Sequence, residues 1–286
     1  MRRTALAVAL AVVAVALTAA APARGEGEAH VAALQVALRA KGMYRSSVDG
    51  VLGPRTRAAI RRFQRRAGLV PDGVAGPRTR RAFGRFGRHR LGSRVLRDGA
   101  SGWDVAALQF SLAWHGFASG TFDGVFGPRT EEAVRGFQHY ADLNEDGIAG
   151  PATLRALSGP LPASPLGVAW PIHTRVTSPF GPRGDRFHEG VDLAATQGTP
   201  VGAAAPGVVT FAASNDGFGN VVVVAHGSGV VTLYAHLSRF EVAPGTHVST
   251  GDVVGLVGAT GDATGPHLHF EIHVRGAAID PLTALR

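Results

Sequence analysis

Three histidines and one glutamate alternate with apolar residues in the segment HLHFEIHV, residues 267–274. Alternate side chains of a β-strand share one face, so this pattern predicts a strand with one polar face and one apolar face that packs on a core. His267 and His269 would then have Cα atoms about 7 Å apart on the same face, which lets both side chains reach one centre. Imidazoles gathered in this way are compatible with a metal site, but by themselves they indicate one only weakly.

A second apolar segment, VTLYAHL at residues 231–237, contains one histidine. The same alternation predicts a strand in which His236 shares a polar face with Thr232 and Tyr234, opposite the aliphatic residues. A histidine on the polar face of an apolar strand fits a metal site, but it equally fits an ordinary strand residue.

The segment HEGVD, residues 188–192, offers a histidine and an aspartate four residues apart. It is similar at its start to the helical zinc motif His-Glu-x-x-His, but Gly190 and Val191 are poor helix residues and the fifth residue is Asp192. A straight strand would place the two ends of the segment about 13 Å apart, too far for one zinc ion. If His188 and Asp192 act together, the chain has to bend, and Gly190 is the residue that permits the bend. The alternative is an ion pair within a loop.

These segments lie in a C-terminal region, residues 169–286, where short runs of Val, Ala, Thr and Leu are separated by Gly. The region predicts a mostly antiparallel β-sandwich or open barrel, because it has no helix-length period. A linker rich in Pro and small residues, residues 159–168, precedes it. The strands that the apolar runs predict are residues 221–224, 230–237, 253–257 and 268–274.

Four motifs stand out in this region: Ser178-x-Phe180-Gly181-x-Arg183, His188-x-x-x-Asp192, Tyr234-Ala235-His236-Leu237, and Gly258-x-Thr260-Gly261-x-x-Thr264-Gly265-Pro266-His267-Leu268-His269-Phe270-Glu271. Together they resemble the lysostaphin and LytM-type zinc metalloendopeptidases of bacterial cell walls, over roughly residues 168–283. The resemblance implies that His188, Asp192 and His269 bind Zn²⁺. It also implies that His236 and His267 are the catalytic pair.

Such a ligand set would leave Zn²⁺ at a net charge of +1 with an open fourth position, the arrangement of catalytic zinc. Water bound there can reach a pKa near 7, and the metal polarises the scissile carbonyl. The histidine pair would orient or deprotonate the water and stabilise the oxyanion, with neither role assigned to either residue. Glu271 either fixes an imidazole tautomer behind the site or is a solvated strand residue. His226, His247 and His273 are expected at the surface.

The middle of the chain is an internal repeat. Residues 31–83 align without gaps on residues 105–157, an offset of 74, with 28 identities over 53 positions. Each copy contains the octet Asp-Gly-x-x-Gly-Pro-x-Thr twice, 23 residues apart. Asp-Gly supplies a turn in which one residue is free to take a positive φ. Gly-Pro begins a helix, because proline at the first helical position loses no hydrogen bond.

Apolar residues between the octets recur at a spacing of three to four, which predicts three short helices in each copy. Leu-Gln early, the octet centrally and Phe-Gln late make each copy resemble the peptidoglycan-binding domain of cell-wall enzymes. The resemblance implies two non-catalytic wall-binding bundles, residues 24–90 and 91–158. The repeated residues themselves are expected to determine the fold. The apolar positions include Val31, Leu34, Leu38, Ile60 and Phe63 and their counterparts Val105, Leu108, Leu112, Val134 and Phe137.

The net charge of +8 arises in one part of the chain. Residues 24–100 carry 17 Arg and one Lys against five acidic residues, a net charge of +13, whereas the chain after residue 100 is net acidic. In the second copy Glu131 and Glu132 stand where the first has Arg57 and Ala58. The first copy is therefore expected to face an anionic wall polymer, unless its arginines are only a solvated helix face.

The N-terminus has the pattern of an export signal. Two arginines precede an uncharged stretch, residues 4–23, that ends in Ala21-Pro22-Ala23. This predicts a cleaved signal peptide over residues 1–23, or an uncleaved anchor, since the stretch is long enough to span a bilayer. Either places the remainder outside the cytoplasm, where nucleic acid is not an expected partner. The chain has no Cys, so a disulfide, a thiolate zinc site and a cysteine-linked lipid are not expected.

Taken together, the sequence predicts a multidomain α + β protein in which two three-helix bundles precede a β-rich peptidase domain. We expect a secreted zinc endopeptidase that cuts peptide stems or cross-links of peptidoglycan and binds the wall through its repeats. Two alternatives stay open, a non-catalytic regulator of another wall hydrolase and a secreted polyanion-binding protein. The intact set of five site residues disfavours the regulator, because such proteins commonly lose ligands. The sequence assigns no oligomeric state.

Overall fold

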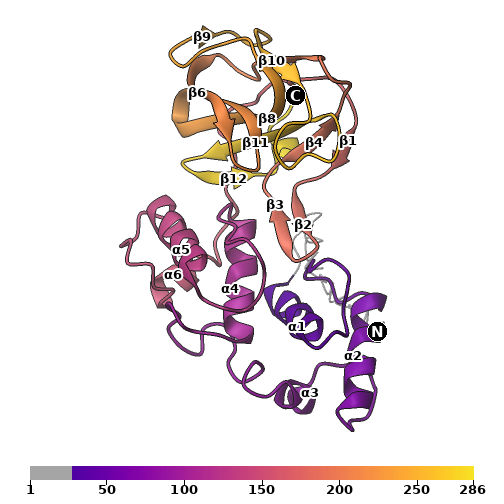
Figure 1. Cartoon of the computed structure of the whole chain (residues 1–286). Coiled ribbons are helices and arrows are strands. Elements are labelled where there is room, and N and C mark those ends of the chain that lie inside the picture. The colour runs from indigo at the N-terminus through magenta and orange to yellow at the C-terminus, as the bar shows by residue number, and fades with distance from the viewer. Residues whose placement is uncertain (1–27) are drawn as a thin grey trace, which may run out of the picture.

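The computed structural model describes residues 28–286, so the predicted signal segment, residues 1–23, lies outside the described residues. Six helices form an N-terminal region, and the strands that follow form a β domain (Figure 1). This confirms the predicted fold class. Within residues 28–286, no helix combines the length and the apolarity that crossing a bilayer requires.

Each repeat supplies three helices, and those of the second repeat lie 74 residues after those of the first. They are α1 (Ala29–Ala40), α2 (Pro54–Arg66) and α3 (Pro77–Ala82), then α4 (Trp103–Trp114), α5 (Pro128–Tyr140) and α6 (Pro151–Ala156). Four of the six begin with a proline that follows a glycine, as the octet predicts. The apolar residues at helical spacing are buried.

A buried glutamine closes each of the four octet turns. In the first turn, Nε2 of Gln35 donates to Asp49 at 2.6 Å, to Thr56 at 3.1 Å and to the carbonyl of Val51 at 3.1 Å. Its Oε1 accepts from the N–H of Gly50 at 2.9 Å. The repeated octet residues therefore hold the fold, as expected, but the sequence did not reveal that a glutamine is their centre. The same four contacts recur around Gln64, Gln109 and Gln138.

The two repeats pack against each other through the equivalent helices α1 and α4. Their apolar residues form one shared core, to which Leu34 and Phe63 contribute from the first repeat and Phe110 from the second. A further core lies within the second repeat, around Leu108 and Phe137. The helical region is thus a single packed unit in which equivalent helices of the two repeats meet.

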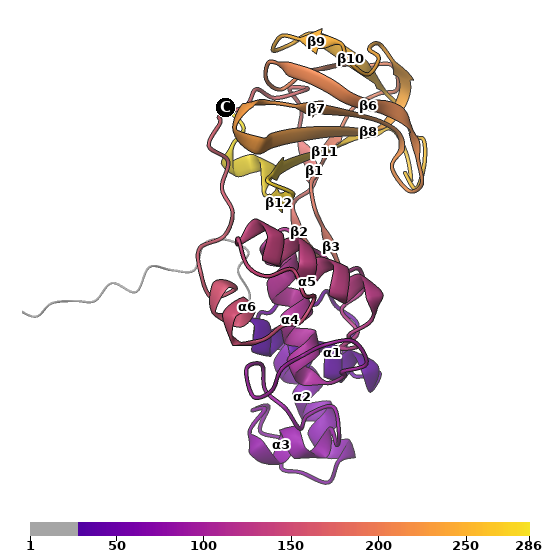
Figure 2. The ribbon, with the colours of Figure 1, turned by 90° about the vertical axis from the view of Figure 1, so that its left-hand side faces the viewer.

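Ten strands of the β domain form one antiparallel sheet, in the order β1–β4–β11–β8–β7–β6–β9. Strand β10 pairs with β5 and β8, and β12 pairs with β11. The remaining two strands, β2 (Gly181–Arg183) and β3 (Arg186–His188), form a hairpin that projects toward the helices (Figure 2). The bounds of the ten are β1 (Val176–Ser178), β4 (Val191–Ala194), β5 (Pro200–Gly202), β6 (Gly207–Asn215), β7 (Gly219–Ala225), β8 (Val230–Phe240), β9 (His247–Val248), β10 (Val253–Val257), β11 (His267–Val274) and β12 (Ala277–Ile279).

The core of the β domain lies under the apolar face of β11. Leu268, Phe270 and Ile272 are fully buried there, as the alternation of that segment predicts. Val168, at the end of the expected linker, pairs with Leu285 and belongs to the same core. With one face of β11 fixed in the core, its histidines must point to the opposite face.

Candidate metal centre

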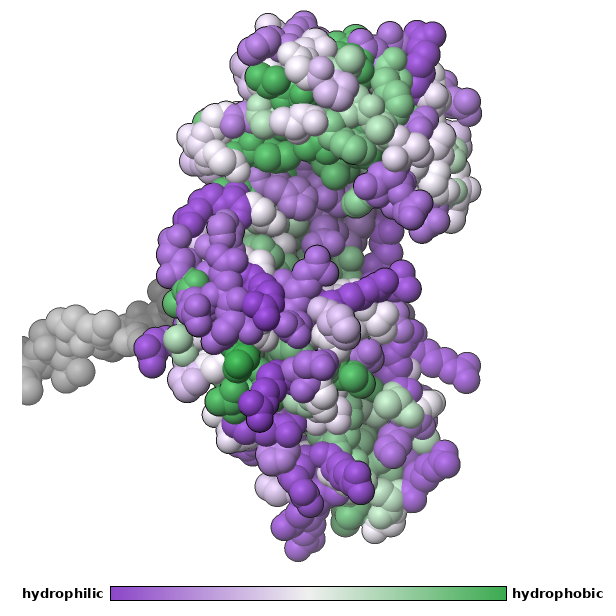
Figure 3. All heavy atoms as spheres, turned by 60° about the vertical axis from the view of Figure 1, so that its left-hand side comes forward, coloured by the Kyte–Doolittle hydropathy of each residue, from purple (hydrophilic) through white to green (hydrophobic). Residues whose placement is uncertain are grey.

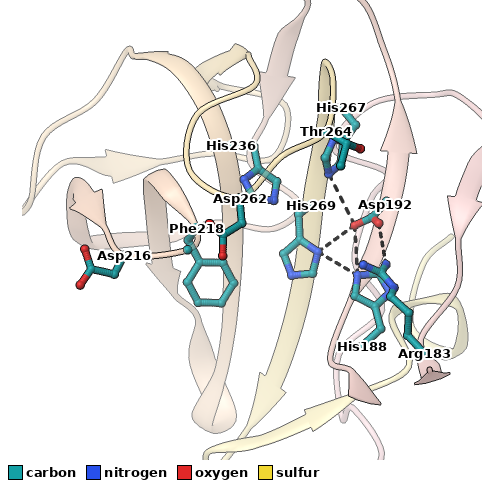
Figure 4. Close-up of a pocket in the computed structure, with 11 residues that line it drawn as sticks. Arg183, His188, Asp192, Asp216, Phe218, His236, Asp262, Thr264, His267 and His269 are labelled. Carbon is teal, nitrogen blue, oxygen red and sulfur yellow. Dashed lines mark hydrogen bonds and ion pairs between the residues drawn. The ribbon is translucent and has the colours of Figure 1, made fainter. Parts of the chain in front are cut away.

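The polar face of β11 forms one wall of a pocket of about 320 Å³ (Figure 4). His188, Asp192 and His269 lie together on one side of it, and His236 and His267 lie beside them. The structure therefore brings the five predicted site residues together from four strands, β3, β4, β8 and β11. The pocket is also lined by Arg183, Asp216, Gly217, Phe218, Asp262 and Thr264.

Three side chains in this pocket are spaced as ligands of one ion. Oδ1 of Asp192 lies 3.0 Å from Nε2 of His188 and 2.9 Å from Nδ1 of His269, and the two ring nitrogens are 3.0 Å apart. Asp192 on β4 stands opposite His269 on β11 in the register of the sheet, and the hairpin brings in His188. These three atoms could hold a metal ion, and nitrogen and oxygen donors suit Zn²⁺.

The imidazole rings of His188 and His269 each form a hydrogen bond through their second nitrogen, on the side away from Asp192. Nδ1 of His188 donates to the carbonyl of Pro179 at 2.8 Å, and Nε2 of His269 donates to Glu271 at 2.8 Å. A carbonyl and a carboxylate can only accept, so in the neutral rings the nitrogens that face Asp192 present lone pairs. Two lone pairs and a carboxylate oxygen that converge on one point are a donor set for a divalent cation. The residues present therefore fit a metal ion.

The chain bends between β3 and β4, as predicted, and Gly190 lies at the bend. A Cβ on Gly190 would come within 2.4 Å of the carbonyl oxygen of Phe270 and 2.9 Å of the ring of His269. Any larger residue would thus push β11 away from the hairpin. Close approach of two backbones is the reason for glycine here.

His236 reaches the pocket by a route that the sequence did not predict. Thr232 and Tyr234, expected on its face, are fully buried in the core, where the Tyr234 hydroxyl bonds to Thr232 and to the N–H of Ala204. Strict alternation would send His236 into the core with them. Its backbone has a φ of +61°, next to an irregular register between β7 and β8, and this turns the imidazole into the pocket. The predicted shared polar face is wrong because the strand is not regular at this residue.

His236 and His267 are oriented in the same way: Nδ1 of each ring bonds to a backbone carbonyl, so Nε2 is the nitrogen that stays available. Nδ1 of His236 donates to the carbonyl of Thr260, and Nδ1 of His267 donates to the carbonyl of Gly265, each at 2.8 Å. The ring centroids are 4.8 Å apart. Burial, together with neighbouring imidazoles, lowers the pKa of His236. A neutral His236 therefore has a free lone pair on Nε2 at neutral pH.

Residues 186–281, which include all five site residues, match peptidase family M23. They form a peptidase family M23 domain. Residues 27–83 and 101–157 match the family described as "Putative peptidoglycan binding domain". Both domain types, and their order along the chain, agree with the two resemblances that the sequence motifs carry.

Among curated proteins, the chain is 49% identical over 118 residues to the DD-carboxypeptidase/endopeptidase Mpg of Neisseria meningitidis serogroup B, a match that covers 39% of this chain and 27% of the relative. It is 36% identical over 159 residues to the peptidoglycan DD-endopeptidase ShyA of Vibrio cholerae, covering 52% of this chain and 36% of the relative. The chain thus spans about a quarter to a third of the length of these two relatives. Among solved structures, a zinc-containing peptidase from Vibrio cholerae shares 35% identity, with a TM-score of 0.39, over 41% of this chain and 40% of that chain.

Asp192 and His269 of the M23 domain shift each other's pKa. Burial raises the pKa of Asp192, but hydrogen bonds from His188 and His269 outweigh burial and hold it well below its usual range. Burial lowers the pKa of His269, but hydrogen bonds to Asp192 and Glu271 outweigh burial and raise it to about 9. The carboxylate of Asp192 is therefore charged at neutral pH, as a carboxylate ligand of a divalent cation has to be.

Glu271 lies behind His269 in the M23 domain and is 4% exposed. Its two oxygens accept from Nε2 of His269 at 2.8 Å and from Nε2 of His273 at 2.7 Å. Burial raises the pKa of Glu271, but these bonds outweigh burial and lower it to about 2, so the carboxylate is charged. Of the two interpretations left open by the sequence, the structure shows the one in which Glu271 fixes an imidazole tautomer.

Two of the three histidines expected at the surface are half-buried in the M23 domain and hydrogen-bonded there. His273 is the second partner of Glu271, because it shares the polar face of β11 with the site. His226 is half-buried and bonds to the carbonyl of Pro206 and to Thr232, each at 2.8 Å. His247 is exposed, as expected.

Two lining residues contact the proposed ligands and were not identified from the sequence. Nη2 of Arg183 lies 2.7 Å from Oδ2 of Asp192, so it holds the oxygen that faces away from the other ligands. The ring of Phe218, in the turn between β6 and β7, lies 5.7 Å from the ring of His269. Arg183 lies within one of the recognised motifs. For Phe218 the available signal was a single aromatic residue between two glycines.

Proposed function

We propose that this chain is a secreted, zinc-dependent endopeptidase that hydrolyses peptide stems or cross-links of bacterial peptidoglycan. The M23 domain supports a peptidase, and a relative named as a peptidoglycan endopeptidase supports the substrate. The observation that carries the proposal is the convergence of two imidazole nitrogens and one carboxylate oxygen, from His188, His269 and Asp192, in an open pocket. A non-catalytic regulator is the alternative, and the presence of all five site residues in one pocket weighs against it.

We assign His188, Asp192 and His269 as the ligands of Zn²⁺. Zn²⁺ in this donor set would have an open position and would supply Lewis acidity toward a water and a scissile carbonyl. Arg183 occupies the outer oxygen of Asp192, so Oδ1 is the atom that faces the ligand position. Glu271 fixes the ring of His269 from behind.

We assign proton transfer and oxyanion stabilisation jointly to His236 and His267. Burial keeps the pKa of His236 low, so at neutral pH its Nε2 can accept a proton from the attacking water. The resulting imidazolium can return that proton to the departing amine. Nε2 of His267 lies 3.8 Å from Oδ1 of Asp192 in the same pocket. Because Nδ1 donates to the carbonyl of Gly265, His267 would stabilise an oxyanion as the imidazolium.

We propose that the repeats hold the enzyme on the wall and that the first repeat also binds an anionic wall polymer. Figure 3 shows hydrophilic side chains over most of one face of the helical region. Among residues 28–286, none of the exposed arginines of α2, α3 and the segment after α3 lies within ion-pair distance of a carboxylate. Charge that no acidic neighbour neutralises attracts a polyanion. These arginines are Arg55, Arg57, Arg61, Arg62, Arg65, Arg66, Arg78, Arg81, Arg85, Arg88 and Arg90.

The proposed organisation begins with an export signal at residues 1–23. Wall-binding repeats follow at residues 24–90 and 91–158, and residues 159–168 link them to a peptidase domain at residues 169–286. This order would place the enzyme outside the cytoplasm, where its proposed substrate lies.

Digestion of purified peptidoglycan by the full chain tests this function. The protein would be stripped of metal with a chelator and assayed before and after addition of Zn²⁺, with mass analysis of the released fragments. We expect new amino termini in stem or cross-link peptides only after Zn²⁺ is restored, and none from the His269→Ala variant. Cleavage by the stripped protein, or by His269→Ala, would contradict the metal assignment, and release of fragments without new amino termini would contradict the peptidase.

A further inference from the structure

The tip of the β2–β3 hairpin sits between the two repeats and is hydrogen-bonded to both. The N–H of Val48 donates to the carbonyl of Gly184 at 2.7 Å, and the N–H of Phe122 donates to the carbonyl of Asp185 at 2.6 Å. Val48 and Phe122 are 74 residues apart, so they are the same position in the two repeats. The internal symmetry of the helical region thus presents two equivalent donors to adjacent carbonyls of one turn.

Side chains of the first repeat add polar contacts at the same tip. The hydroxyl of Ser47 accepts from the N–H of Gly184 at 3.1 Å. Nη2 of Arg39 lies 3.2 Å from Oδ2 of Asp185, with both side chains about one-third exposed. Backbone and side-chain groups of Gly184 and Asp185 are therefore engaged by both repeats, with the side-chain contacts coming from the first repeat alone.

The second repeat adds an aromatic contact along the hairpin. The ring of Trp114, at the end of α4, lies 5.2 Å from that of Phe187 and 6.2 Å from that of Phe180, and the two phenylalanine rings are 4.9 Å apart. All three pairs meet edge to face, a favourable geometry. The equivalent residue of the first repeat is Ala40, so this contact belongs to the second repeat alone.

The opposite end of the same hairpin carries a ligand of the proposed metal centre. His188 is the last residue of β3 and pairs with Gly181 at the base, and Arg183 on β2 holds Asp192. A hairpin of two three-residue strands is not stable by itself, so its position depends on what it packs against. In this chain it packs against the helical repeats at its tip and along one face (Figure 1).

We propose that the two repeats position His188 by holding this hairpin, through a clamp formed by Arg39, Ser47, Val48, Trp114 and Phe122. The inference rests on the proposed function, since it assigns to the repeats a role in the metal centre as well as in wall binding. The clamp residues touch neither metal nor substrate and act through the hairpin as positioning residues. Loss of the clamp is expected to loosen β3 and to weaken metal binding.

The test compares three variants of the full chain. Trp114→Ala removes the aromatic part of the clamp, and Trp114→Phe keeps a ring there. Asp142→Ala is the matched control, because it breaks the ion pair between Asp142 and Arg275, which joins the same two parts of the molecule away from the hairpin. The readouts are zinc affinity, by competition with a chromogenic chelator, and amide hydrogen exchange of residues 180–188 in the metal-free protein.

We expect Trp114→Ala to weaken zinc binding about tenfold, the lower end of the range for groups that support a ligand from outside. Exchange of the amides of residues 186–188 should become faster in the same variant. Trp114→Phe should restore most of both properties, and Asp142→Ala should leave both at the wild-type level.

Unchanged zinc affinity and unchanged exchange in Trp114→Ala would overturn the proposal. Equal losses in Asp142→Ala would overturn it as well, because they would show that weakening any contact between the helical region and the M23 domain reduces zinc binding. Should Trp114→Ala unfold the helices, the double variant Arg39→Ala/Ser47→Ala carries the same prediction with a smaller loss, about threefold. A wild-type chain that binds no zinc would instead refute the proposed metal centre, while hydrogen exchange would still report on the clamp.

Discussion

The helical repeats and the M23 domain position their polar residues in opposite ways. In the repeats each buried cluster is local, since its glutamine and threonine are 21 or 15 residues apart, and the same contacts occur in all four clusters. In the M23 domain His188 and His269 are 81 residues apart, and their meeting depends on the register of several strands. A helical fold can thus be copied along a chain as a short local pattern, whereas the proposed metal centre requires the register of the whole sheet.

The two repeats also differ from each other, although they share a fold. Both keep the glutamine cluster, but the second has Glu131 and Gly136 where the first has Arg57 and Arg62. The buried residues thus preserve the structure, and the exposed residues are free to take different partners. Trp114, which is half-buried and contacts the hairpin, is a further difference, since the first repeat has Ala40 at that position.

The largest expected effect concerns His236 in the M23 domain. His236→Ala removes a proposed proton acceptor without touching a ligand, so we expect kcat to fall by roughly 10²–10⁴-fold while bound zinc stays at one ion per chain. Steady-state kinetics on a peptide substrate and metal analysis measure the two quantities. His247→Ala, at an exposed histidine, is the control and should change neither; lost zinc in His236→Ala would contradict the assignment.

The pH dependence of wild-type activity also tests the proposed role of His236 as proton acceptor. The neutral form of His236 is the proposed acceptor, and burial lowers its pKa from the usual value near 6.5. Activity should therefore persist down to pH 6.5 and fall about tenfold per pH unit once the pH drops below the pKa of this group. An acid limb in kcat that begins above pH 7 would contradict a depressed His236.

In the repeats, a single buried glutamine should matter for stability and not for chemistry. Gln109→Ala leaves Asp123, Thr130 and the N–H of Gly124 without their partner, so we expect a loss of about 2–3 kcal/mol in the free energy of unfolding. Chemical denaturation followed by circular dichroism measures it. The control is Gln197→Ala, at an exposed glutamine, which should change the free energy of unfolding by less than about 0.5 kcal/mol. An equal loss in both variants would show that the hydrogen bonds of Gln109 do not stabilise the fold.

The smallest effect concerns the surface of the first repeat. Exchanging Arg57 and Arg62 for the residues of the second repeat, Arg57→Glu with Arg62→Gly, should weaken binding to walls that carry anionic polymer about fivefold at low salt, since exposed charges contribute up to about 1 kcal/mol each. Co-sedimentation with walls, before and after chemical removal of the polymer, measures it. The difference between variant and wild type should vanish at high salt or on stripped walls; a difference that persists there would show specific, uncharged recognition.

Sequence could predict whatever follows from regular periodicity. The offset of 74, the octet and its prolines place the helices, and the alternation of residues 267–274 places the polar and apolar faces of β11. It could not place His236, because a left-handed φ at one residue reverses the face that alternation assigns. It also gave no sign of the contacts between the hairpin and the repeats, because these depend on how separately folded parts pack.

The proposed function depends above all on the binding of one zinc ion by His188, Asp192 and His269. Crystals of the full chain grown with Zn²⁺ and measured at the zinc absorption edge test it directly, because anomalous scattering locates the metal independently of the protein chain. We expect one anomalous peak per chain, within about 2.0–2.2 Å of Nε2 of His188, Nδ1 of His269 and Oδ1 of Asp192. No peak at that position, or a peak held by other residues with these three side chains apart, would contradict it.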